Sequence, residues 1–326
     1  MPTLSDFEFS DLILTEGDPA TWFFKGAPDH SLTALDQEMQ RECGELLGLL
    51  KNSYEGKSSS LSLRVEFADI PFRVAVYNDF QRGRVFFLRR LPKTIPGFHE
   101  LGFLDSVANW LMRKELTKGL VLIAGPQASG KTTVASAYVA ARLKAYNGHA
   151  ITYEHPVEMP LAGPHGEAGF CYQNDIESEA DLPGHIERSH RYGAPNIIFI
   201  GEIRTKYAAS EVLRIALGSS QQLVVATTFG SDLKAALERL LTWAKELDGE
   251  IAQHNLSQTL LACVHQELLF DQKTKTKTLN VKEFLLLPFD ERSDPIRAKI
   301  RDGNLYLADH IRDQKSQILY GLGDFK

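Results

Sequence analysis

The stretch from Gly119 to Thr133, GLVLIAGPQASGKTT, decides how the chain folds. Its first seven residues are apolar or small throughout, which is typical of a strand that is buried on both faces of a parallel sheet. Residues 125–132 fit the spacing G-x-x-x-x-G-K-[ST] of a phosphate-binding loop, and helix-forming residues follow from Lys131. A strand, this loop and a helix in that order predict a nucleotide site. A chance glycine-rich turn before a helix is the alternative explanation.

The backbone of the predicted loop does most of the binding. Successive N–H groups in such a loop converge on one anion, and the N-terminus of the following helix adds partial positive charge. We expect Lys131 to reach the β- and γ-phosphates of ATP and the Thr132 hydroxyl to ligate Mg²⁺. The full set of predicted nucleotide-binding residues is Gly125, Pro126, Gln127, Ala128, Ser129, Gly130, Lys131, Thr132 and Thr133.

Two acidic segments follow other predicted strands. Residues 196–200, NIIFI, form a buried-strand pattern that leads into Glu202, at the edge of the sheet from which an acid reaches a magnesium ion. The segment 151–158, ITYEHPVE, also leaves a strand and carries Glu154 and Glu158. Solvated loop acids are the alternative explanation for Glu158 and Glu202.

The pattern divides the chain into two domains. Residues 1–92 combine short strands, a helix over 31–51 after a serine cap, and a hairpin that turns at Arg82 and Gly83, which predicts a small α+β domain. Prolines and a glycine in residues 93–100 predict a linker. Residues 101–326 alternate apolar strands with helices, including helices over 131–146 and 207–217, and end in a helical part around a hairpin at 268–287. This second pattern predicts an α/β nucleotide-binding domain.

The composition excludes several other classes of protein. The chain has 326 residues, 36 Lys and Arg against 42 Asp and Glu, and a net charge of −6, which argues against direct binding of nucleic acid. Three widely spaced cysteines predict neither disulfides nor a thiolate zinc site. The first residues lack the pattern of a signal peptide, and the apolar runs are far shorter than the roughly 18 residues of a membrane span. We therefore expect a cytoplasmic protein that does not span a membrane.

The ordered motifs resemble those of the type II/type IV secretion ATPases, in particular the PilT-like branch. GPQASGKTT (125–133) is similar to the family's Walker A motif, ITYEHPVE (151–158) to its acidic Asp box, and IIFIGEIR (197–204) to its Walker B motif. SDLILTEGDPATWFFKG (10–26) is similar to the family's first strand, and FRVAVYNDFQRGRVFFLRRLP (72–92) to its arginine-bearing hairpin. PIRAKI (295–300) partly matches the AIRNLI signature of the retraction branch.

The resemblance implies an α/β fold: a RecA-like P-loop ATPase domain behind a smaller, PAS-like N-terminal α+β domain. It further implies a homo-oligomer, a hexameric ring that binds ATP and Mg²⁺. Glu158 corresponds to the family's catalytic base, Glu202 to the Walker B acid that ligates the metal, and Lys131 to the phosphate-binding lysine. By motif match, Arg82 and Arg89 approach the nucleotide, although hairpin surface charges are an alternative explanation for both.

Four positions depart from the family pattern. His155 replaces an aspartate of the Asp box, and Gln222 and Phe229 stand where the family's His box has histidines. Ala128 replaces a loop glycine and stiffens the loop if that position has positive φ. Mg²⁺, the lysine, an acid and positive charge remain available, but the γ-phosphate sensing by the family's His box is weakened, so we expect a slow ATPase rather than an inactive one.

Three functions are consistent with these features. The first is a motor that powers a type IV pilus or a type IV secretion or conjugation machine, at the inner membrane and attached to it through platform or secretion-channel proteins. The second is a catalytically weakened nucleotide-binding regulatory or scaffold subunit that acts with a competent paralogous ATPase. The third, a metabolic P-loop kinase, lacks any segment that resembles a lid over an acceptor substrate.

Overall fold

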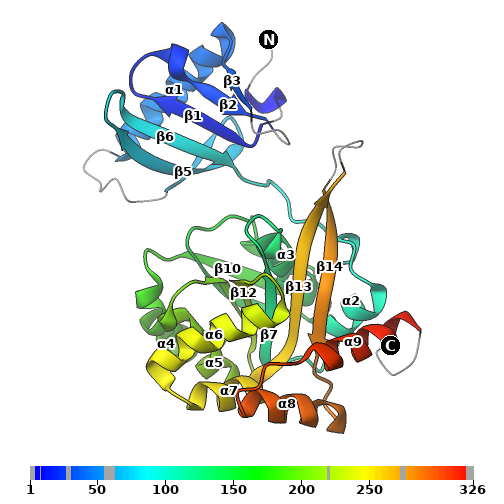
Figure 1. Ribbon diagram of the computed structural model, residues 1–326. Helices are drawn as coiled ribbons and strands as arrows, with labels where there is room; N and C mark the ends of the chain where they lie inside the picture. Colours follow the sequence, from blue (N-terminus) through cyan, green and yellow to red (C-terminus); the bar gives the residue numbers. More distant parts are fainter. Residues whose placement is uncertain are drawn as a thin grey trace. The chain divides into compact units, whose positions relative to one another are not determined.

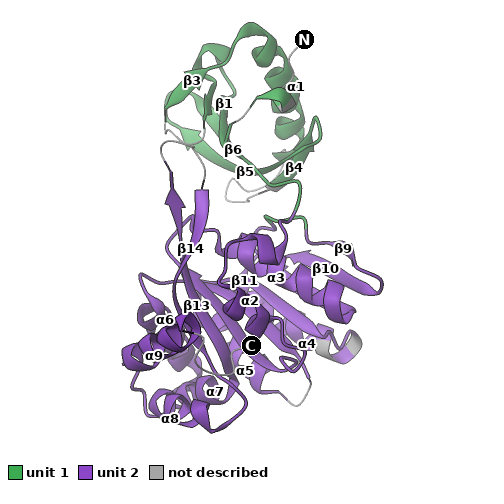
Figure 2. Cartoon of the chain, turned by 90° about the vertical axis from the view of Figure 1, so that its right-hand side faces the viewer, with its two compact units in different colours: residues 1–94, 158–160 green, residues 95–157, 161–326 purple. Residues whose placement is uncertain are grey.

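The computed structural model describes residues 4–7, 9–26, 31–54, 63–218, 221–271 and 277–320. The chain forms two compact units, residues 1–94 with 158–160 and residues 95–157 with 161–326, which Figure 2 colours separately. The second unit begins at Ile95, inside the predicted linker of 93–100. The reason is Phe98, which is 3% exposed and packs against Phe103 and Tyr138 in the core of that unit.

The first unit is an antiparallel sheet of six strands with one long helix. The strands follow one another in the order β3-β2-β1-β6-β5-β4, and β5 and β6 form the predicted hairpin. Its elements are β1 (Asp11–Thr15), β2 (Phe23–Lys25), β3 (Leu32–Ala34), α1 (Gln37–Tyr54), β4 (Leu63–Phe67), β5 (Ile70–Asp79) and β6 (Gly83–Arg90), with 3₁₀ turns at Leu4–Asp6 and Pro19–Thr21.

The predicted start of the helix at residue 31 is wrong. Residues 32–34 form strand β3, which pairs with β2, and pairing with a neighbouring strand overrides the helical spacing there. The helix begins only after Asp36, whose Oδ1 accepts a hydrogen bond from Met39 N at 2.8 Å, so Asp36 supplies the cap that was predicted for Ser31. The buried face of α1 then packs with the buried residues of β5 and β6 in one core.

The second unit contains an eight-stranded sheet in the order β14-β13-β7-β12-β11-β8-β10-β9. The six inner strands are parallel, and the two edge strands, β14 and β9, pair antiparallel with their neighbours. The strands are β7 (Gly119–Gly125), β8 (Gly148–Glu154), β9 (Gly163–His165), β10 (Gly169–Asp175), β11 (Ile197–Ile203), β12 (Leu223–Phe229), β13 (Leu260–Phe270) and β14 (Lys277–Leu286).

Helices cover both faces of this sheet, as the apolar strands predict (Figure 1). The helices are α2 (Asp105–Leu111), α3 (Lys131–Tyr146), α4 (Leu182–Tyr192), α5 (Lys206–Leu217), α6 (Leu233–Asp248), α7 (Ile251–Thr259), α8 (Asp294–Arg301) and α9 (Ala308–Leu319), with 3₁₀ turns at Phe98–Glu100, Glu179–Asp181 and Glu291–Ser293. The helix predicted over 131–146 is confirmed, and the one predicted over 207–217 begins one residue earlier. Among the described residues, no helix is both long enough and apolar enough to cross a membrane.

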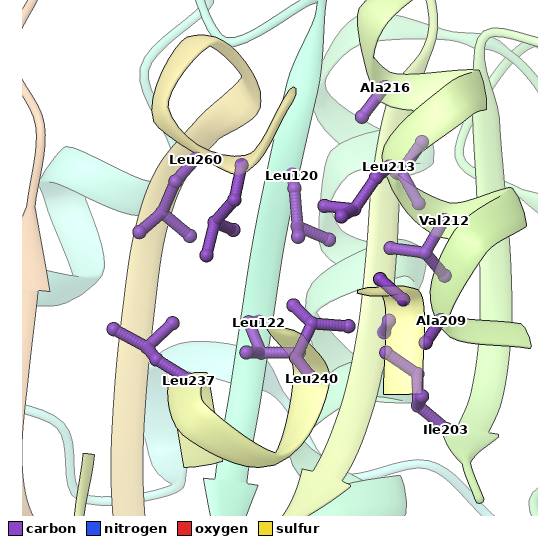
Figure 3. Packing of buried hydrophobic residues seen from close by; sticks show 14 of the residues in the cluster. Leu120, Leu122, Ile203, Ala209, Val212, Leu213, Ala216, Leu237, Leu240 and Leu260 are labelled. Atoms are coloured by element: carbon purple, nitrogen blue, oxygen red, sulfur yellow. The ribbon is translucent and has the colours of Figure 1, made fainter. Parts of the chain in front are cut away.

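Strand β7 divides the interior of the second unit into two cores. Leu120 and Leu122 point to one side, where they pack with residues of α5 and α6 such as Leu213 and Leu240 (Figure 3). Val121, between them in sequence, belongs to the core on the other side, with residues of α2 and α3. Full burial of such side chains contributes about 1.5 to 3 kcal/mol each, so β7 is firmly fixed.

The predicted C-terminal hairpin is confirmed. Strands β13 and β14 pair antiparallel from Ala262 opposite Leu286 to Phe270 opposite Lys277, and residues 272–276 between them lie outside the described ranges. Helix α9 is fastened to this hairpin by Gln314, whose amide accepts from Leu286 N and donates to Leu286 O. The hairpin also joins the parallel sheet, because β13 pairs with β7.

A buried arginine holds the end of helix α2 and offers a test of the packing. Arg142 of α3 is 5% exposed and donates to the carbonyl oxygens of Leu111, Arg113 and Leu116. Arg142→Met should lower the free energy of unfolding by about 2 to 4 kcal/mol, because three carbonyl oxygens each lose a hydrogen bond from the buried guanidinium. Urea unfolding followed by circular dichroism measures this change.

The matched control is Arg191→Met, which removes an exposed ion pair with Glu187. We expect it to change the free energy of unfolding by less than about 1 kcal/mol. Equal losses in the two variants would show that the Arg142 hydrogen bonds do not stabilise the fold.

Candidate nucleotide site

Three parallel strands, β11, β12 and β7, end at one edge of the sheet in the second unit, and β13 runs past them. Ile203, Thr228, Ala124 and His265 are register partners across β11, β12, β7 and β13. The phosphate loop begins directly after Ala124, and Glu202 directly precedes Ile203. Since neighbouring strands lie about 4.8 Å apart, β11 and β7 are separated by roughly 10 Å. The predicted loop and the predicted Walker B acid therefore share one edge of the sheet.

The phosphate loop makes a tight turn between β7 and α3. A Cβ atom on Gly125 would lie 2.3 Å from the Gln266 carbonyl oxygen and 2.6 Å from Ser129 Oγ, so only glycine fits. Gly130, at φ +79°, is the N-cap residue of α3. Because glycine has no side chain to accept from the first N–H groups of the helix, these donors are left for an anion.

Lys131 lies folded back on the loop. Its side chain is buried, and Nζ donates to Pro126 O at 2.7 Å and to Gly125 O at 3.2 Å. The same Nζ lies 4.4 Å from the centroid of the Phe229 ring, and the Arg239 guanidinium lies 5.7 Å from that ring. A cation over an aromatic face is stabilised by about 0.5 to 2 kcal/mol. At the position of the family histidine, this chain thus has a ring that holds the lysine and has no donor for a phosphate.

The remaining loop residues differ in their exposure to solvent. Pro126, Gln127 and Ala128 are exposed, whereas Ser129 is 2% exposed. Thr132 and Thr133, in the first turn of α3, are half-buried. Ala128 has a positive φ of +59°, a conformation that glycine adopts more easily than alanine. The alanine is therefore expected to stiffen the loop.

Glu202 stands at the carboxyl edge with an arginine as its partner. Its side chain is 15% exposed, and Oε2 accepts from Arg204 Nε and pairs with Arg204 Nη2. The preceding Gly201 accepts from Thr227 Oγ1 at 2.5 Å, and a Cβ there would lie 3.0 Å from Glu154 Cγ. Glu154 thus packs closely against Gly201, and a larger residue there would have to displace it. Arg204 is a charged neighbour of the site that the motif comparison did not single out.

Glu154 is a buried acid at the end of β8. Its side chain is 2% exposed, and Oε1 accepts from Thr152 Oγ1 at 2.7 Å and from Gln173 Nε2 at 2.8 Å. Gln173 Oε1 in turn accepts from the backbone N–H groups of Leu161 and Ala162. Gln173 thus connects Glu154, at the end of β8, with Leu161 and Ala162, which follow the acidic segment. Sequence reasoning missed Gln173, whose only signal is the register of β10 with β8.

Glu158, the predicted base, groups with the first unit. Its Oε1 accepts from Arg73 Nη1 at 2.8 Å, and both side chains are about one-third exposed, 31% for Arg73 and 35% for Glu158. Arg82, at the β5–β6 turn, donates from its backbone N–H to Asp79, and its side chain is exposed. Among the cations of the first unit, the acid is therefore paired with Arg73, which motif matching did not select.

Arg89 also lies in the first unit, on β6. Its Nε donates to Asp11 Oδ1 at 2.9 Å, and it is the register partner of Arg73 on β5. The predicted site residues thus fall into two sets. The loop residues and Glu202 come together in the second unit, and Glu158, Arg82 and Arg89 belong to the first.

The other departures from the family pattern lie away from the loop. His155 Nδ1 is 2.6 Å from Ile176 O. Gln222, which is 2% exposed, precedes Leu223 at the amino end of β12. Phe229 ends the same strand, roughly 23 Å further at 3.3 Å per residue. Gln222 is thus at the opposite edge of the sheet from Phe229 and does not reach the same phosphate.

Burial raises the pKa of two groups in the second unit. Burial raises the pKa of Glu179, and the hydrogen bond that its Oε2 accepts from Thr205 Oγ1 at 2.7 Å opposes the rise. Burial also raises the pKa of the Cys171 thiol to about 12. A thiol with so high a pKa is protonated at neutral pH and is therefore weakly reactive.

The backbone of Ala128 provides a test of loop strain. An alanine at positive φ costs roughly 1 kcal/mol relative to glycine, part of which is offset because glycine gains entropy in the unfolded chain. Ala128→Gly should therefore raise the free energy of unfolding by roughly 0.5 to 1 kcal/mol in urea titrations. Ala141→Gly, within helix α3, should lower it by about 1 kcal/mol. A loss in both variants would show that the loop is not strained.

Comparison with known proteins supports these assignments of fold and family. The type IV pilus ATPase PilU of Pseudomonas aeruginosa is 28% identical over 269 residues, which cover 80% of this chain and 66% of that protein. The type IV pilus retraction ATPase PilT of the same organism is 26% identical over 229 residues, 68% of this chain and 63% of that protein. The aligned part thus spans about two thirds of the length of these curated relatives.

Solved structures show the same fold over nearly the whole chain. The pilus retraction motor PilT with bound ADP has a TM-score of 0.74 at 25% identity and covers 96% of this chain and 89% of that one. The ATPase DotB of Legionella pneumophila has a TM-score of 0.68 at 21% identity, with 92% and 83% covered. The predicted fold class, a RecA-like domain with a smaller N-terminal α+β domain, is confirmed. Since the family model described as type II/IV secretion system protein matches residues 56–303, the chain belongs to that family.

Proposed function

We propose that the chain is a P-loop ATPase that hydrolyses ATP to ADP and phosphate and powers a type IV pilus or a type IV secretion or conjugation machine as a hexameric motor. One observation carries the proposal: the loop at Gly125–Thr133 leaves its strand at the edge of the sheet that also carries Glu202. The relatives named as pilus ATPases support the same activity. The two domains have separate roles in hydrolysis. Residues 101–326 bind the nucleotide, and residues 1–92 supply arginines that stabilise its negative charge.

The donor set fits Mg²⁺ that arrives with the nucleotide. Mg²⁺ prefers oxygen ligands and usually takes one or two from the protein, with phosphates and waters completing its shell. The Thr132 hydroxyl and the Glu202 carboxylate are such ligands. The described residues contain no group of three His, Cys, Asp or Glu side chains that forms a metal cage of its own. Bound Mg²⁺ neutralises charge on the transferring phosphoryl group.

The side chains then have separate roles in hydrolysis. Lys131 exchanges the carbonyl oxygens of Gly125 and Pro126 for the β- and γ-phosphates. Glu158 accepts a proton from the attacking water, for which its carboxylate must leave Arg73. Arginines of the first unit, among them Arg82 and Arg89, stabilise the developing negative charge in the assembled ring.

A motor of this kind works on the cytoplasmic side of the inner membrane, where platform or secretion-channel proteins hold it. A paralogous ATPase is a further candidate partner in the same machine. The alternative function, a weakened regulatory subunit, is not favoured, because the relatives are named as ATPases. We expect turnover to be slow, since the Phe229 ring has no donor for the γ-phosphate.

Two substitutions test the nucleotide site separately from the chemistry. Lys131→Ala should abolish both ATP binding and phosphate release, because the loop loses its only side-chain cation for the phosphates. Glu158→Gln should retain ATP affinity and lower kcat by roughly 100-fold or more, because the water loses its base. Calorimetric titration with ATP and Mg²⁺, together with a phosphate-release assay, distinguishes the two.

Glu167→Gln is the matched control, since Glu167 is an exposed acid at the turn before β10. It should behave like the wild type in both assays. Wild-type protein that binds no nucleotide would refute the ATPase proposal, and normal turnover by Glu158→Gln would remove Glu158 from the role of base.

Phe229→His tests the cause of slow turnover. An imidazole adds a hydrogen-bond donor beside Lys131 and keeps an aromatic ring, so kcat at saturating ATP should rise about tenfold. Phe229→Leu removes the ring and adds no donor, and it should give no rise. If the histidine variant is no faster than the wild type, Phe229 does not limit hydrolysis.

A further inference from the structure

Gln266 of strand β13 contacts both ends of the phosphate loop. Its side chain is fully buried, and Nε2 donates to Ser129 O at 2.7 Å, across 137 residues of sequence. The backbone carbonyl oxygen of Gln266 is the atom that leaves no room for a Cβ on Gly125. A Cβ on Gly130 would lie 3.6 Å from the same Nε2. A single residue distant in sequence thus borders the first, fifth and sixth residues of the loop.

The ladder between β13 and β14 is irregular next to Gln266. His265 is opposite Glu283, but the next residue, Gln266, is opposite Val281, so β14 contains one extra residue. Both faces of β13 are covered here, so the consecutive residues His265 and Gln266 are both 0% exposed. His265 Nε2 lies 3.1 Å from Gly230 O, directly after β12. Strand β13 therefore reaches the phosphate loop and the loop after Phe229 together.

The polar atoms around this contact are costly for stability. In the described part of the chain, Gln266 Oε1, Ser129 Oγ and His265 Nδ1 are buried without a hydrogen-bond partner. Each such atom destabilises the fold, and an apolar side chain in its place would avoid the cost. Local rules that are broken at one place in a structure mark functional sites more often than random positions. Stability alone therefore does not explain a glutamine at position 266.

The geometry of the peptide bond shows what Gln266 can do. In a trans peptide, the C=O of Ser129 and the N–H of Gly130 belong to one rigid plane and point in opposite directions. When Gln266 Nε2 holds the Ser129 carbonyl on the β13 side, the Gly130 N–H must point away from β13. This fixes one of the backbone donors on which an anion in the loop depends.

We propose that Gln266 is a positioning residue for nucleotide binding, which orients the phosphate loop through the Ser129 carbonyl. The inference rests on the proposed function, because it concerns the same loop. It adds a residue outside the sequence motifs and predicts that nucleotide affinity depends on a single N–H donor from β13. The donor acts through the backbone and does not touch the nucleotide.

Gln266→Glu tests this donor by pH. A protonated carboxyl group can still donate to the Ser129 carbonyl, whereas a carboxylate cannot, and burial raises the pKa of such an acid toward neutrality. ADP affinity of the full chain with Mg²⁺, measured by calorimetry from pH 5.5 to pH 9, should be near that of the wild type at the acidic end. At the alkaline end it should be about tenfold weaker than the wild type.

Two further variants make the test independent of folding. Gln266→Met has similar length, no donor and no charge, so its ADP affinity should be about tenfold weaker at every pH. Gln314→Glu is the control, because Gln314 is also buried and bonded to a carbonyl, that of Leu286 on β14. It should lower thermal stability at alkaline pH and leave ADP affinity unchanged.

The possible results separate the two proposals. Wild-type affinity in both Gln266 variants, or the same pH-dependent loss of affinity in Gln314→Glu, would overturn the role of Gln266. Failure of the wild-type chain to bind ADP at all would instead refute the proposed ATPase.

Discussion

The burial of strand β7 on both faces is the constraint on which the rest of the second unit depends. Its side chains enter the two separate cores in alternation, so neither face can rotate toward solvent. The residue that ends the strand, Gly125, is therefore delivered to a fixed point at the carboxyl edge of the sheet. The phosphate loop can be built almost entirely from backbone because its two anchors, β7 and α3, pack into one core.

Charge is distributed unevenly along this edge. Acids end three neighbouring strands: Asp175 on β10, Glu154 on β8 and Glu202 near the end of β11. The positive groups, Lys131 and the N-terminus of α3, follow β7 on the other side of β12. A polyphosphate with a divalent cation suits this boundary, because the anion faces the helix and the cation faces the acids. Phe229 lies between the two sides and keeps Lys131 in place without adding charge.

Those parts of the site that are continuous in sequence could be predicted, and those made by pairing of distant strands could not. The loop from Gly125 and the acid at Glu202 follow directly from the ends of apolar strands. The replacement of a loop glycine by Ala128 also points to a position where φ matters, and φ is positive there. Gln266 and Gln173 gain their roles only from strand registers that no local pattern specifies. The start of α1 was misplaced for the same reason, since β3 is a strand only because β2 lies beside it.

The central position of β7 has a consequence for biogenesis. Its neighbours in the sheet, β12 and β13, are encoded far downstream, and the Gln266 contact spans 137 residues. Contacts between such distant segments form late and slowly. During synthesis from the N-terminus, the glycine-rich turn leaves the ribosome long before the strands that enclose it. A partly translated chain therefore carries the whole motif with an incomplete frame around it, and the frame closes only after β13 has been synthesised.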